Sequence, residues 1–294
     1  MIDNDKLSKL RSMYAIKAND LITKSRFSLT LEQQKILLYM ISKVTPLDSP
    51  SDWFEIEVQD YCEICGLARN GYYYNNIKKS LKGLADKSCW IKDRNGKIKI
   101  FRWLDEVEII EKGGGTIRYT FHKNVALFLF ELKEKFTKIE LIQTLTFRSQ
   151  YTIRLYEYLK VHSFRAYKDG GYAPYELEVK LEDLMSALDL VRDCEHCEKE
   201  KDCDARKHGE KCEKEKYERL QDFRRRVLEV AENEINNKTT DMRIEISYGK
   251  DGRRTDRVIF KYLPIWQPDE ASASSQRRRI LNGEENRNTR GTNS

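Results

Sequence analysis

The sequence is poor in the residues that mark several large classes of protein. Only 14 of its 294 residues are glycine and 5 are proline, which excludes collagen-like and low-complexity chains and permits long helices. Apolar runs such as Val125 to Phe130 are far shorter than the ~20 residues that a membrane span needs. The first residues show no basic segment followed by an apolar one. We therefore predict no signal peptide and an intracellular protein.

The motifs of common enzymes are also missing. The sequence has no GxxxxGKS/T phosphate loop, no GxGxxG, no HExxH and no GxSxG. It has only four histidines, of which His122 and His162 are isolated and are expected to pack in the core or cap a helix. No close histidine pair accompanies a tyrosine, as rolling-circle nicking would require. We therefore expect a protein that is not an enzyme.

Charged and apolar residues are abundant instead. Charged residues make up 35% of the chain, above the ~25% of an average globular protein, and hydrophobic residues make up 39%. The 54 Lys and Arg exceed the 48 Asp and Glu by only six, so an acidic partner is indicated only where the positive charge is clustered. At roughly 100–200 residues per domain, the length predicts two domains.

An internal repeat is the clearest signal in the sequence. Glu55 to Val58 alternates like a short strand and leads into a helical pattern that ends at Gly66-Leu67; Glu176 to Val179 and the pattern ending at Asp189-Leu190 repeat this order. A basic amphipathic helix follows each copy, with matching apolar positions: Ile77, Leu81 and Leu84, and Phe223, Val227 and Val230.

Each basic helix is followed by a hairpin pattern and preceded by a further helix. The first hairpin is predicted at 89–101, where Asn95-Gly96 favours a two-residue turn, with another strand at 116–121; the second is predicted at 243–262. The preceding helices are expected at 31–44, where Thr30 and Gln33 have the spacing of a capping box, and at 146–163. This order predicts an α+β protein of two tandem winged-helix domains.

The predicted boundaries follow from the repeat. The first winged-helix domain spans residues 1–122, the second spans 123–266, and the polar residues 267–294 form a disordered tail. The stretch 124–143 has a helical pattern and is expected to bridge the domains. The second domain carries an insert, residues 192–216, between the two helices of its helix-turn-helix.

The basic helix of the second copy, residues 217–235, is the predicted main reader of DNA. On a helical wheel its polar face presents Gln221, Arg225 and Arg226, which are able to bond bidentately to adenine or guanine in the major groove. The same face carries the acids Glu218, Asp222 and Glu229, which weaken the indication, although a carboxylate is able to accept from cytosine N4. Arg224 falls within the apolar arc, so it either reads the major groove with the other two arginines or reaches a phosphate. Three arginines seen alone would more often form a solvated face, but the repeat and the basic wing favour DNA binding.

Other candidate DNA contacts surround this helix. The predicted wing carries Lys250, Arg253, Arg254 and Arg257, and the start of the long helix carries Arg148, Ser149 and Gln150, where a helix N-terminus is able to hold a phosphate. In the first copy, Lys78 and Lys79 are candidates for DNA contact, but the neighbouring Tyr72 to Tyr74 favour packing or an interface.

The insert of the second copy holds four of the seven cysteines: Cys194, Cys197, Cys203 and Cys212. Four soft ligands opened by CxxC suit a structural, tetrahedral zinc site, in which His208 is the alternative fourth ligand. Redox-active thiols in a loose loop and an iron–sulfur cluster remain alternatives. Cys62, Cys65 and Cys89 occupy apolar positions and are expected to be small core residues.

Residues 15–263 resemble the replication initiators of iteron-containing plasmids, a theta-replicating family. Two blocks carry most of the resemblance, TFRSQYTIRLYEYLK at 146–160 and FRRRVLEVAENEIN at 223–236. The resemblance implies two winged-helix domains of common origin that bind directly repeated double-stranded DNA sites at a plasmid origin, in the bacterial cytoplasm. It further implies recruitment of a host replication initiator and helicase, and a homodimer in equilibrium with monomer, in which dimers repress the initiator's own promoter.

A winged-helix transcriptional repressor without a replication role is the alternative, because the helix-turn-helix pattern alone does not separate the two functions. A zinc-dependent enzyme is a more remote one.

Overall fold

The structure is a computed structural model that describes residues 13–68, 71–92, 97–110, 115–168, 171–190, 217, 219–252 and 254–265. By internal contacts the chain divides into two units, Met1–Leu263 and Pro264–Ser294. Both winged-helix motifs belong to the first unit. The predicted tail at 267–294 lies outside the described residues. Within the described part of the chain, no helix is long and apolar enough to cross a membrane.

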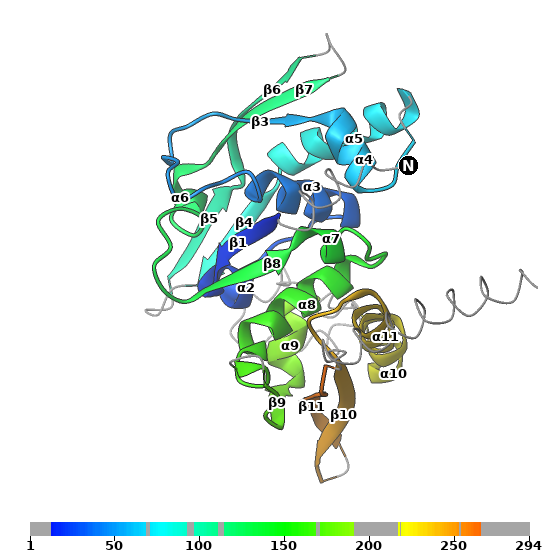
Figure 1. Cartoon of the computed structure of the whole chain (residues 1–294). Helices are drawn as coiled ribbons and strands as arrows, with labels where there is room; N and C mark the ends of the chain where they lie inside the picture. The colour runs from blue at the N-terminus through cyan, green and yellow to red at the C-terminus, as the bar shows by residue number, and fades with distance from the viewer. Residues whose placement is uncertain are drawn as a thin grey trace, which may run out of the picture. The chain divides into compact units, whose positions relative to one another are not determined.

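The described residues form mixed helices and strands, which Figure 1 labels in chain order. They are β1 (Tyr14–Ala18), α2 (Asn19–Lys24), β2 (Ser25–Arg26), α3 (Leu31–Ile41), β3 (Phe54–Glu57), α4 (Val58–Ile64), α5 (Gly71–Ala85), β4 (Ser88–Lys92), β5 (Ile98–Arg102), β6 (Leu104–Ile110), β7 (Thr116–Phe121), α6 (Lys123–Ala126), β8 (Phe136–Glu140), α7 (Leu141–Thr144), α8 (Gln150–Ser163), β9 (Tyr175–Lys180), α9 (Leu181–Ala187), α10 (Leu220–Phe223), η3 (Arg224–Leu228), α11 (Glu229–Lys238), β10 (Ile244–Asp251) and β11 (Arg254–Tyr262).

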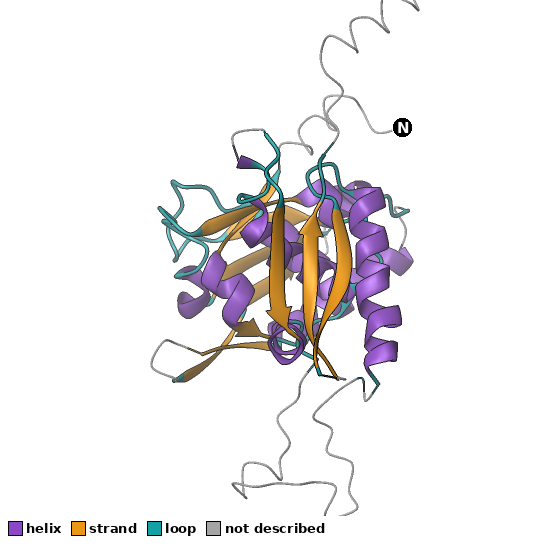
Figure 2. Cartoon of the chain, turned by 90° about the horizontal axis from the view of Figure 1, so that it is seen from below, coloured by secondary structure: helices purple, strands orange, loops and turns teal. Residues whose placement is uncertain are grey.

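The same winged-helix topology occurs twice. In the first lobe (residues 31–121) α3, β3, α4 and α5 precede a sheet of order β3-β7-β6; in the second lobe (residues 150–262) α8, β9, α9 and α10–α11 precede a sheet of order β9-β11-β10. In each lobe the last two strands form the hairpin, or wing, which projects past the neighbouring helix in Figure 1. The strands lie among helices in Figure 2. The predicted α+β class with two winged helices is confirmed.

The wing of the first lobe is not the hairpin that the sequence pattern indicates. Strands β4 and β5 do pair, but they form a separate sheet with β2. The wing is β6–β7, because Phe54 and Ile56 of β3 lie opposite Tyr119 and Ile117 of β7 and bury their side chains with them. Such cross-strand pairs decide which strand completes a sheet. The β4–β5 hairpin is therefore an addition between α5 and the wing, with no counterpart among the described residues of the second lobe.

The turns after the two short helices correspond closely. Gly66 and Asp189 both adopt a left-handed backbone, with φ of 66° and 58°. In each turn the next amide reaches back five residues, from Leu67 to the Cys62 carbonyl and from Leu190 to the Met185 carbonyl, both at 2.8 Å. This pattern ends a helix by satisfying its last carbonyls. The repeat thus extends to single backbone positions.

The stretch 124–143 does not form the predicted continuous helix. After α6 the backbone takes positive φ at Glu131 (51°) and Lys135 (55°), and residues 136–140 then form strand β8. The alternating residues Thr137 and Ile139 are buried, and β8 pairs with β1 in a two-stranded sheet. The prediction of a helix over 124–143 was therefore wrong, because the alternation of apolar residues in 136–140 is too short to be distinguished from helical spacing.

A buried ionic cluster ties α8 to the strands near the N-terminus. The Lys17 ammonium of β1 lies 2.5 Å from the Glu157 carboxylate of α8, and both side chains are almost wholly buried. Arg154, one helical turn before Glu157, donates to the Ser25 carbonyl at 3.0 Å and to the Ala187 carbonyl, and its guanidinium lies 3.8 Å from the centre of the Phe27 ring. Three segments distant in sequence therefore meet on α8.

The three cysteines outside the insert, and His122, have the structural roles that the sequence indicates. Cys62 and Cys89 are buried and Cys65 is half-buried. Burial raises the pKa of the Cys65 and Cys89 thiols to about 12, which keeps them protonated and unreactive. The Nδ1 atom of His122 accepts a hydrogen bond from the Asn124 amide and caps α6.

Candidate nucleic-acid interface

The basic helix of the second lobe is interrupted by one turn of π-helix. Helix α10 and helix α11 are joined by residues 224–228, where the Glu229 amide donates to the Arg224 carbonyl five residues back. A π turn accommodates one residue more than an α-helical turn and is frequent at functional sites. Helix α5, at the equivalent place in the first lobe, runs from Gly71 to Ala85 as regular α-helix.

The π turn corrects the predicted correspondence between the two helices. In α5 the buried positions are Ile77, Leu81 and Leu84, as the spacing predicts. In the second lobe Val230 is 38% exposed, whereas Leu228 and Ala231 are fully buried. One extra residue shifts every later position by one, so Ala231 occupies the place that regular α-helix would give to Val230.

Two of the predicted reading arginines face solvent and the third does not. The side chains of Arg225 and Arg226 are 67% and 62% exposed and lie 3.4 and 3.8 Å from the carboxylate of Asp222. Gln221 is also exposed. Arg224 is half-buried, and its guanidinium lies 3.9 Å from the centre of the Tyr248 ring on β10. Arg225, Arg226 and Gln221 are thus each accessible to solvent, while Arg224 is held against the sheet.

Helix α11 is fixed to the sheet behind it. The Ile246 amide donates to Glu232 at 2.8 Å, and Asn236 exchanges two hydrogen bonds with the backbone of Ile244, at 2.8 and 2.9 Å. The apolar face adds Ala231 and Ile235, both fully buried. The direction of the reading segment, residues 220–238, is therefore set by β10, the first strand of the wing.

The start of α8 is occupied by a carboxylate of α11. The amides of Arg148 and Ser149 donate to the two oxygens of Glu234, at 2.8 and 3.2 Å, and the Ser149 hydroxyl caps the amides of the first turn. Burial raises the pKa of Glu234, but the hydrogen bonds from Lys238 and the Arg148 backbone outweigh burial, so its pKa lies below the ordinary value. The backbone amides of Arg148 and Ser149, which the sequence pattern offers to a phosphate, are therefore already bonded to Glu234. The Arg148 side chain is exposed and that of Gln150 half-buried, so DNA contacts through these side chains stay a prediction.

The second wing is partly described. Lys250 is exposed near the tip of β10. Arg257 of β11 lies 2.6 Å from Glu178 on β9 and 3.1 Å from Asp256, so its charge is shared within the sheet. Arg253 and the side chain of Arg254 lie outside the described residues. Their predicted phosphate contacts stay predictions.

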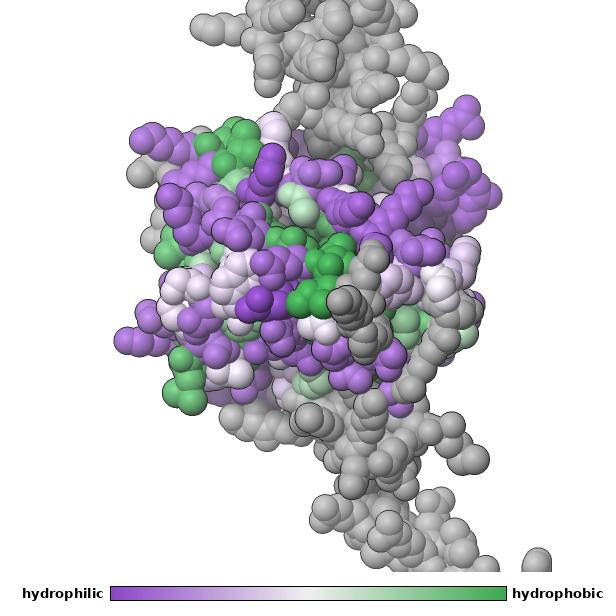
Figure 3. Space-filling view, turned by 90° about the horizontal axis from the view of Figure 1, so that it is seen from above, coloured by the Kyte–Doolittle hydropathy of each residue, from purple (hydrophilic) through white to green (hydrophobic). Residues whose placement is uncertain are grey.

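The first lobe presents a different surface. Lys79 of α5 is exposed, and the Lys78 ammonium lies 5.4 Å from the centre of the Tyr74 ring. The described part of its wing is acidic: Asp105, Glu106 and Glu108 of β6 are exposed, and Arg118 of β7 is paired with Glu55 and Glu108 at 2.9 and 3.1 Å. Seen from above in Figure 3, the molecule is mostly hydrophilic, with small hydrophobic groups between the polar side chains.

Two family models match the chain in consecutive segments. The model described as "Initiator Replication protein, WH1" matches residues 14–160, half of the chain, and the model described as "Initiator Rep protein, WH2" matches residues 210–262. The chain belongs to the Rep3-type family of plasmid replication initiators. The resemblance seen in the sequence is thereby confirmed.

Solved structures show the fold of this Rep3-type initiator in other proteins. The crystal structure of the Pi initiator protein in complex with iteron DNA is similar with a TM-score of 0.65 and 18% identity, over 86% of this chain and 97% of that one. At this identity the likeness shows a shared fold. Two structures of domains 2 and 3 of RctB cover 83% and 84% of this chain and 86% and 82% of theirs, at 10% and 11% identity, but their TM-scores of 0.38 and 0.37 are too low to support an argument.

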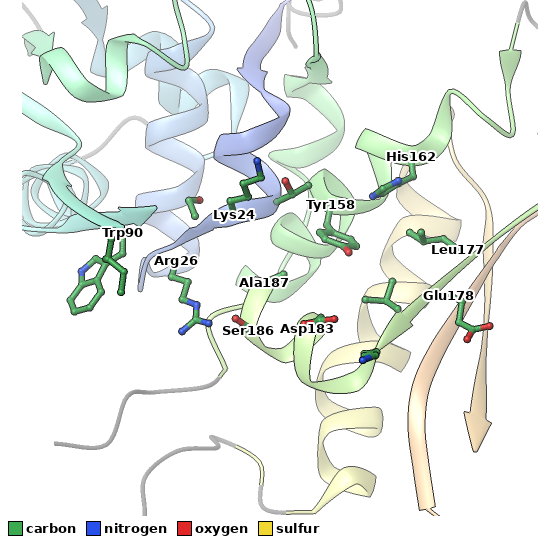
Figure 4. Close-up of a pocket in the computed structure, with 15 residues that line it drawn as sticks. Lys24, Arg26, Trp90, Tyr158, His162, Leu177, Glu178, Asp183, Ser186 and Ala187 are labelled. Atoms are coloured by element: carbon green, nitrogen blue, oxygen red, sulfur yellow. The ribbon is translucent and has the colours of Figure 1, made fainter. Parts of the chain in front are cut away.

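The Rep3-type initiator also has an open cavity of about 950 Å³ between β2, β4–β5 and the β9–α9 segment. Figure 4 shows Lys24 and Arg26 on one side and Tyr158, Glu178 and Asp183 on the other. The cavity mixes acidic and basic groups, which is unsuited to the uniform negative charge of DNA. Its only histidine, His162, has a pKa lowered by burial and by Arg165, and we assign the cavity no chemistry.

Sequence reasoning missed two residues that shape this interface, Tyr248 and Glu234, whereas Asp222 was expected on the polar face and lies beside Arg225 and Arg226. A signal existed for Glu234, because it lies three and seven residues from the buried Ala231 and Val227 and so falls on the inner face of its helix. No signal in the sequence indicates the π turn, or that Tyr248 is the residue that Arg224 contacts. The cysteines proposed as zinc ligands, Cys194, Cys197, Cys203 and Cys212, and the alternative His208 all lie outside the described residues.

Proposed function

We propose that this initiator binds directly repeated double-stranded DNA sites, iterons, at a plasmid origin, and reads them mainly with its second lobe. The observation that carries the proposal is the accessible surface of Arg225, Arg226 and Gln221 on a helix fixed beside a wing. Membership of the initiator family and the fold shared with the Pi initiator protein, which was solved with iteron DNA, support it. The repressor alternative is not favoured.

The geometry suits a division between base and backbone contacts. Guanidinium groups at the exposed turn match guanine in the major groove, where the second helix of a helix-turn-helix lies. Lys250 at the wing and Arg148 before α8 are exposed on flanking elements and suit phosphate contacts, which set orientation rather than sequence. The acidic wing of the first lobe disfavours a phosphate contact there. We therefore assign the first lobe to dimer formation and to nonspecific contact through Lys78 and Lys79.

The further steps of initiation are proposed on the family resemblance. Monomers bound to the repeats open the origin and recruit a host initiator and helicase, while dimers joined through the first lobe repress the promoter of the initiator gene. The protein carries out no covalent chemistry in this scheme. The protein binds and deforms DNA, and the free energy of binding supplies the cost of the deformation.

We also propose one structural zinc ion in the insert 192–216, held by Cys194, Cys197, Cys203 and Cys212 or with His208 in place of one cysteine. The support is the ligand spacing in the sequence. Metal analysis of purified protein should find about one zinc per chain, and Cys194→Ser should remove it. Protein purified without metal that binds DNA with full affinity would contradict the proposal.

Footprinting on the origin of the parent replicon tests the main proposal directly. Monomer and dimer fractions are separated and applied to the same labelled origin fragment. We expect the monomer to protect repeats of about 20 base pairs, roughly two turns of the duplex, beside an A·T-rich segment, and the dimer to protect the promoter. Protection of a single palindrome, with no effect on origin opening, would instead indicate a repressor.

A further inference from the structure

The three consecutive arginines of the second lobe differ in their surroundings. Arg225 and Arg226 project from the π turn with more than 60% of their side chains exposed. Arg224 is half-buried, and its guanidinium lies 3.9 Å from the centre of the Tyr248 ring. A guanidinium over an aromatic face is attracted to the ring, and more strongly where water is partly excluded. Arg224 is therefore committed to the sheet.

Tyr248 lies at the junction between the reading helix and the wing. It belongs to β10, two residues after Ile246, whose amide is bonded to Glu232 of α11. The ladder between β10 and β11 shifts register directly after it, between Gly249 and Lys250. One strand thus holds α11 through Glu232 and Asn236 and holds the π turn through Arg224.

The π turn decides where the neighbouring arginines point. Each residue of an α-helix turns the next side chain by about 100°. Removing the extra residue of the turn while α11 stayed fixed would rotate the first part of the reading segment by about that angle, away from its present direction. Phe223 before the turn and Ala231 after it are both fully buried, so the helix keeps its apolar side towards the core on both sides of the extra residue.

We propose that Arg224 is a positioning residue that acts through Arg225 and Arg226: by stacking on Tyr248 it stabilises the π turn, and the π turn directs these two arginines towards the DNA bases. Tyr248 is thereby a determinant of sequence specificity that contacts no base. The proposal rests on the proposed reading of DNA by the second lobe, and it assigns to Arg224 a role other than a direct DNA contact.

The test compares four variants of the full chain. Arg224→Gln removes the cation and Tyr248→Leu removes the ring, while Tyr248→Phe keeps the aromatic face. Arg165→Gln is the matched control, because Arg165 also lies over a tyrosine ring of the second lobe, at 5.5 Å from the centre of Tyr175, but outside the reading segment. Binding is measured to a duplex with the origin repeat and to a shuffled duplex of equal length, at several salt concentrations.

We expect Arg224→Gln and Tyr248→Leu each to lower the ratio of specific to nonspecific affinity about five- to tenfold, a change typical of a misdirected bidentate contact. The double variant should be no worse than the more affected single variant, because both remove the same contact. Arg165→Gln should stay within about twofold of the unchanged protein, and Tyr248→Phe, which keeps the ring but loses the hydroxyl that is hydrogen-bonded with Arg224, should lower the ratio less than Tyr248→Leu. Tyr248→Leu should leave the salt dependence unchanged, because it removes no charge.

A second measurement does not require DNA. Amide hydrogen exchange in the free protein should rise in Tyr248→Leu for residues 224–229 and stay unchanged for 231–238. A reduced ratio in Arg224→Gln alone would show that Arg224 contacts DNA itself and would overturn the proposal, as would unchanged exchange in Tyr248→Leu. If the unchanged protein did not prefer the origin repeat, the proposed function would fail, and hydrogen exchange alone would decide the role of Arg224.

Discussion

The two lobes share one topology and differ in the helix that topology places beside the wing. In the first lobe α5 is regular α-helix and buries Ile77, Leu81 and Leu84. In the second lobe a π turn interrupts the helix, so that Arg225 and Arg226 project from its outer side while Arg224 returns to the sheet. The order of elements fixes where a recognition helix lies, but a single additional residue decides which side chains it presents.

The wings differ as clearly as the helices. Strand β6 of the first wing exposes Asp105, Glu106 and Glu108, whereas the described part of the second wing exposes Lys250 and Lys261 beside Glu245 and Asp251. Like charge beside a phosphate backbone opposes binding, so the second wing is better suited than the first to follow DNA. Duplicated folds therefore separate their tasks through surface charge while the core pattern is kept.

The largest expected effect concerns the buried ion pair between Lys17 of β1 and Glu157 of α8. This pair joins the second lobe to the strands near the N-terminus, so it tests whether one lobe is able to change without disturbing the other. Glu157→Gln leaves the Lys17 ammonium buried without a counter-charge. We predict a loss of ~3–5 kcal/mol in the free energy of unfolding. Denaturation by urea, followed by circular dichroism, measures it.

The control for this prediction replaces both partners. In the double variant Lys17→Met, Glu157→Met neither charge of the pair is left buried, and Arg154 keeps its bonds to the Ser25 and Ala187 carbonyls but loses the nearby carboxylate, so the free energy of unfolding should recover part of the loss. If Glu157→Gln alone cost less than ~1 kcal/mol, the surroundings of the pair would have to be more hydrated than its burial indicates.

The next effect compares one exposed cation from each recognition helix. Arg225→Ala should lower affinity for the origin repeat by ~1–3 kcal/mol and leave nonspecific affinity much less affected, because a bidentate base contact is lost. Lys79→Ala, on α5, should weaken both duplexes equally and by less. Titrations with origin and shuffled duplexes at one salt concentration separate the two outcomes. Equal loss of sequence preference in both variants would remove the proposed difference between the lobes.

A smaller effect depends on pH and on Glu234, which joins α11 to the start of α8. Because the pKa of Glu234 is lowered in the folded protein, the stability it contributes is complete above the ordinary value and is lost as the pH falls through its folded pKa. Glu234→Gln should therefore differ most from the unchanged protein near neutral pH, and the difference should begin to shrink only below the ordinary carboxyl pKa and vanish once the pH lies below the lowered pKa of the folded protein. Unfolding by urea at a series of pH values measures this.

The exposed Glu229 supplies the control for the pH series, since Glu229→Gln removes one carboxylate from the same helix without touching the contact with the start of α8. A constant difference for Glu234→Gln from neutral to acid pH would mean that its charge is not what stabilises the contact.

The smallest effect is expected at the second wing. Lys250→Ala should weaken binding to all sequences alike and reduce the slope of log affinity against log salt by about one. A change in sequence preference would instead place Lys250 at the bases.

The repeat could be predicted from the sequence because it rests on local patterns. The capping box at Thr30 and Gln33, the turns at Gly66 and Asp189, and the buried positions of α5 all follow from spacing within one element. Two features could not, because they depend on contacts between elements. The choice of β6–β7 as first wing depends on Tyr119 facing Phe54, and the π turn depends on how α11 is held by β10. The sequence therefore indicated a basic helix with Arg225 and Arg226 on its exposed face, but not the contact that holds Arg224 against Tyr248.

Selection of bound duplexes from a randomised pool tests the central claim, that the second lobe supplies the greater share of sequence reading. The pool is bound by the unchanged protein, by Arg225→Ala and by the double variant Lys78→Ala, Lys79→Ala, and the enriched sequences are compared. We predict that the lysine variant selects the same sequence with fewer bound duplexes, while Arg225→Ala loses preference over two or three adjacent base pairs. A lysine variant that selects a different sequence, beside an Arg225→Ala variant that selects the original one, would contradict the claim.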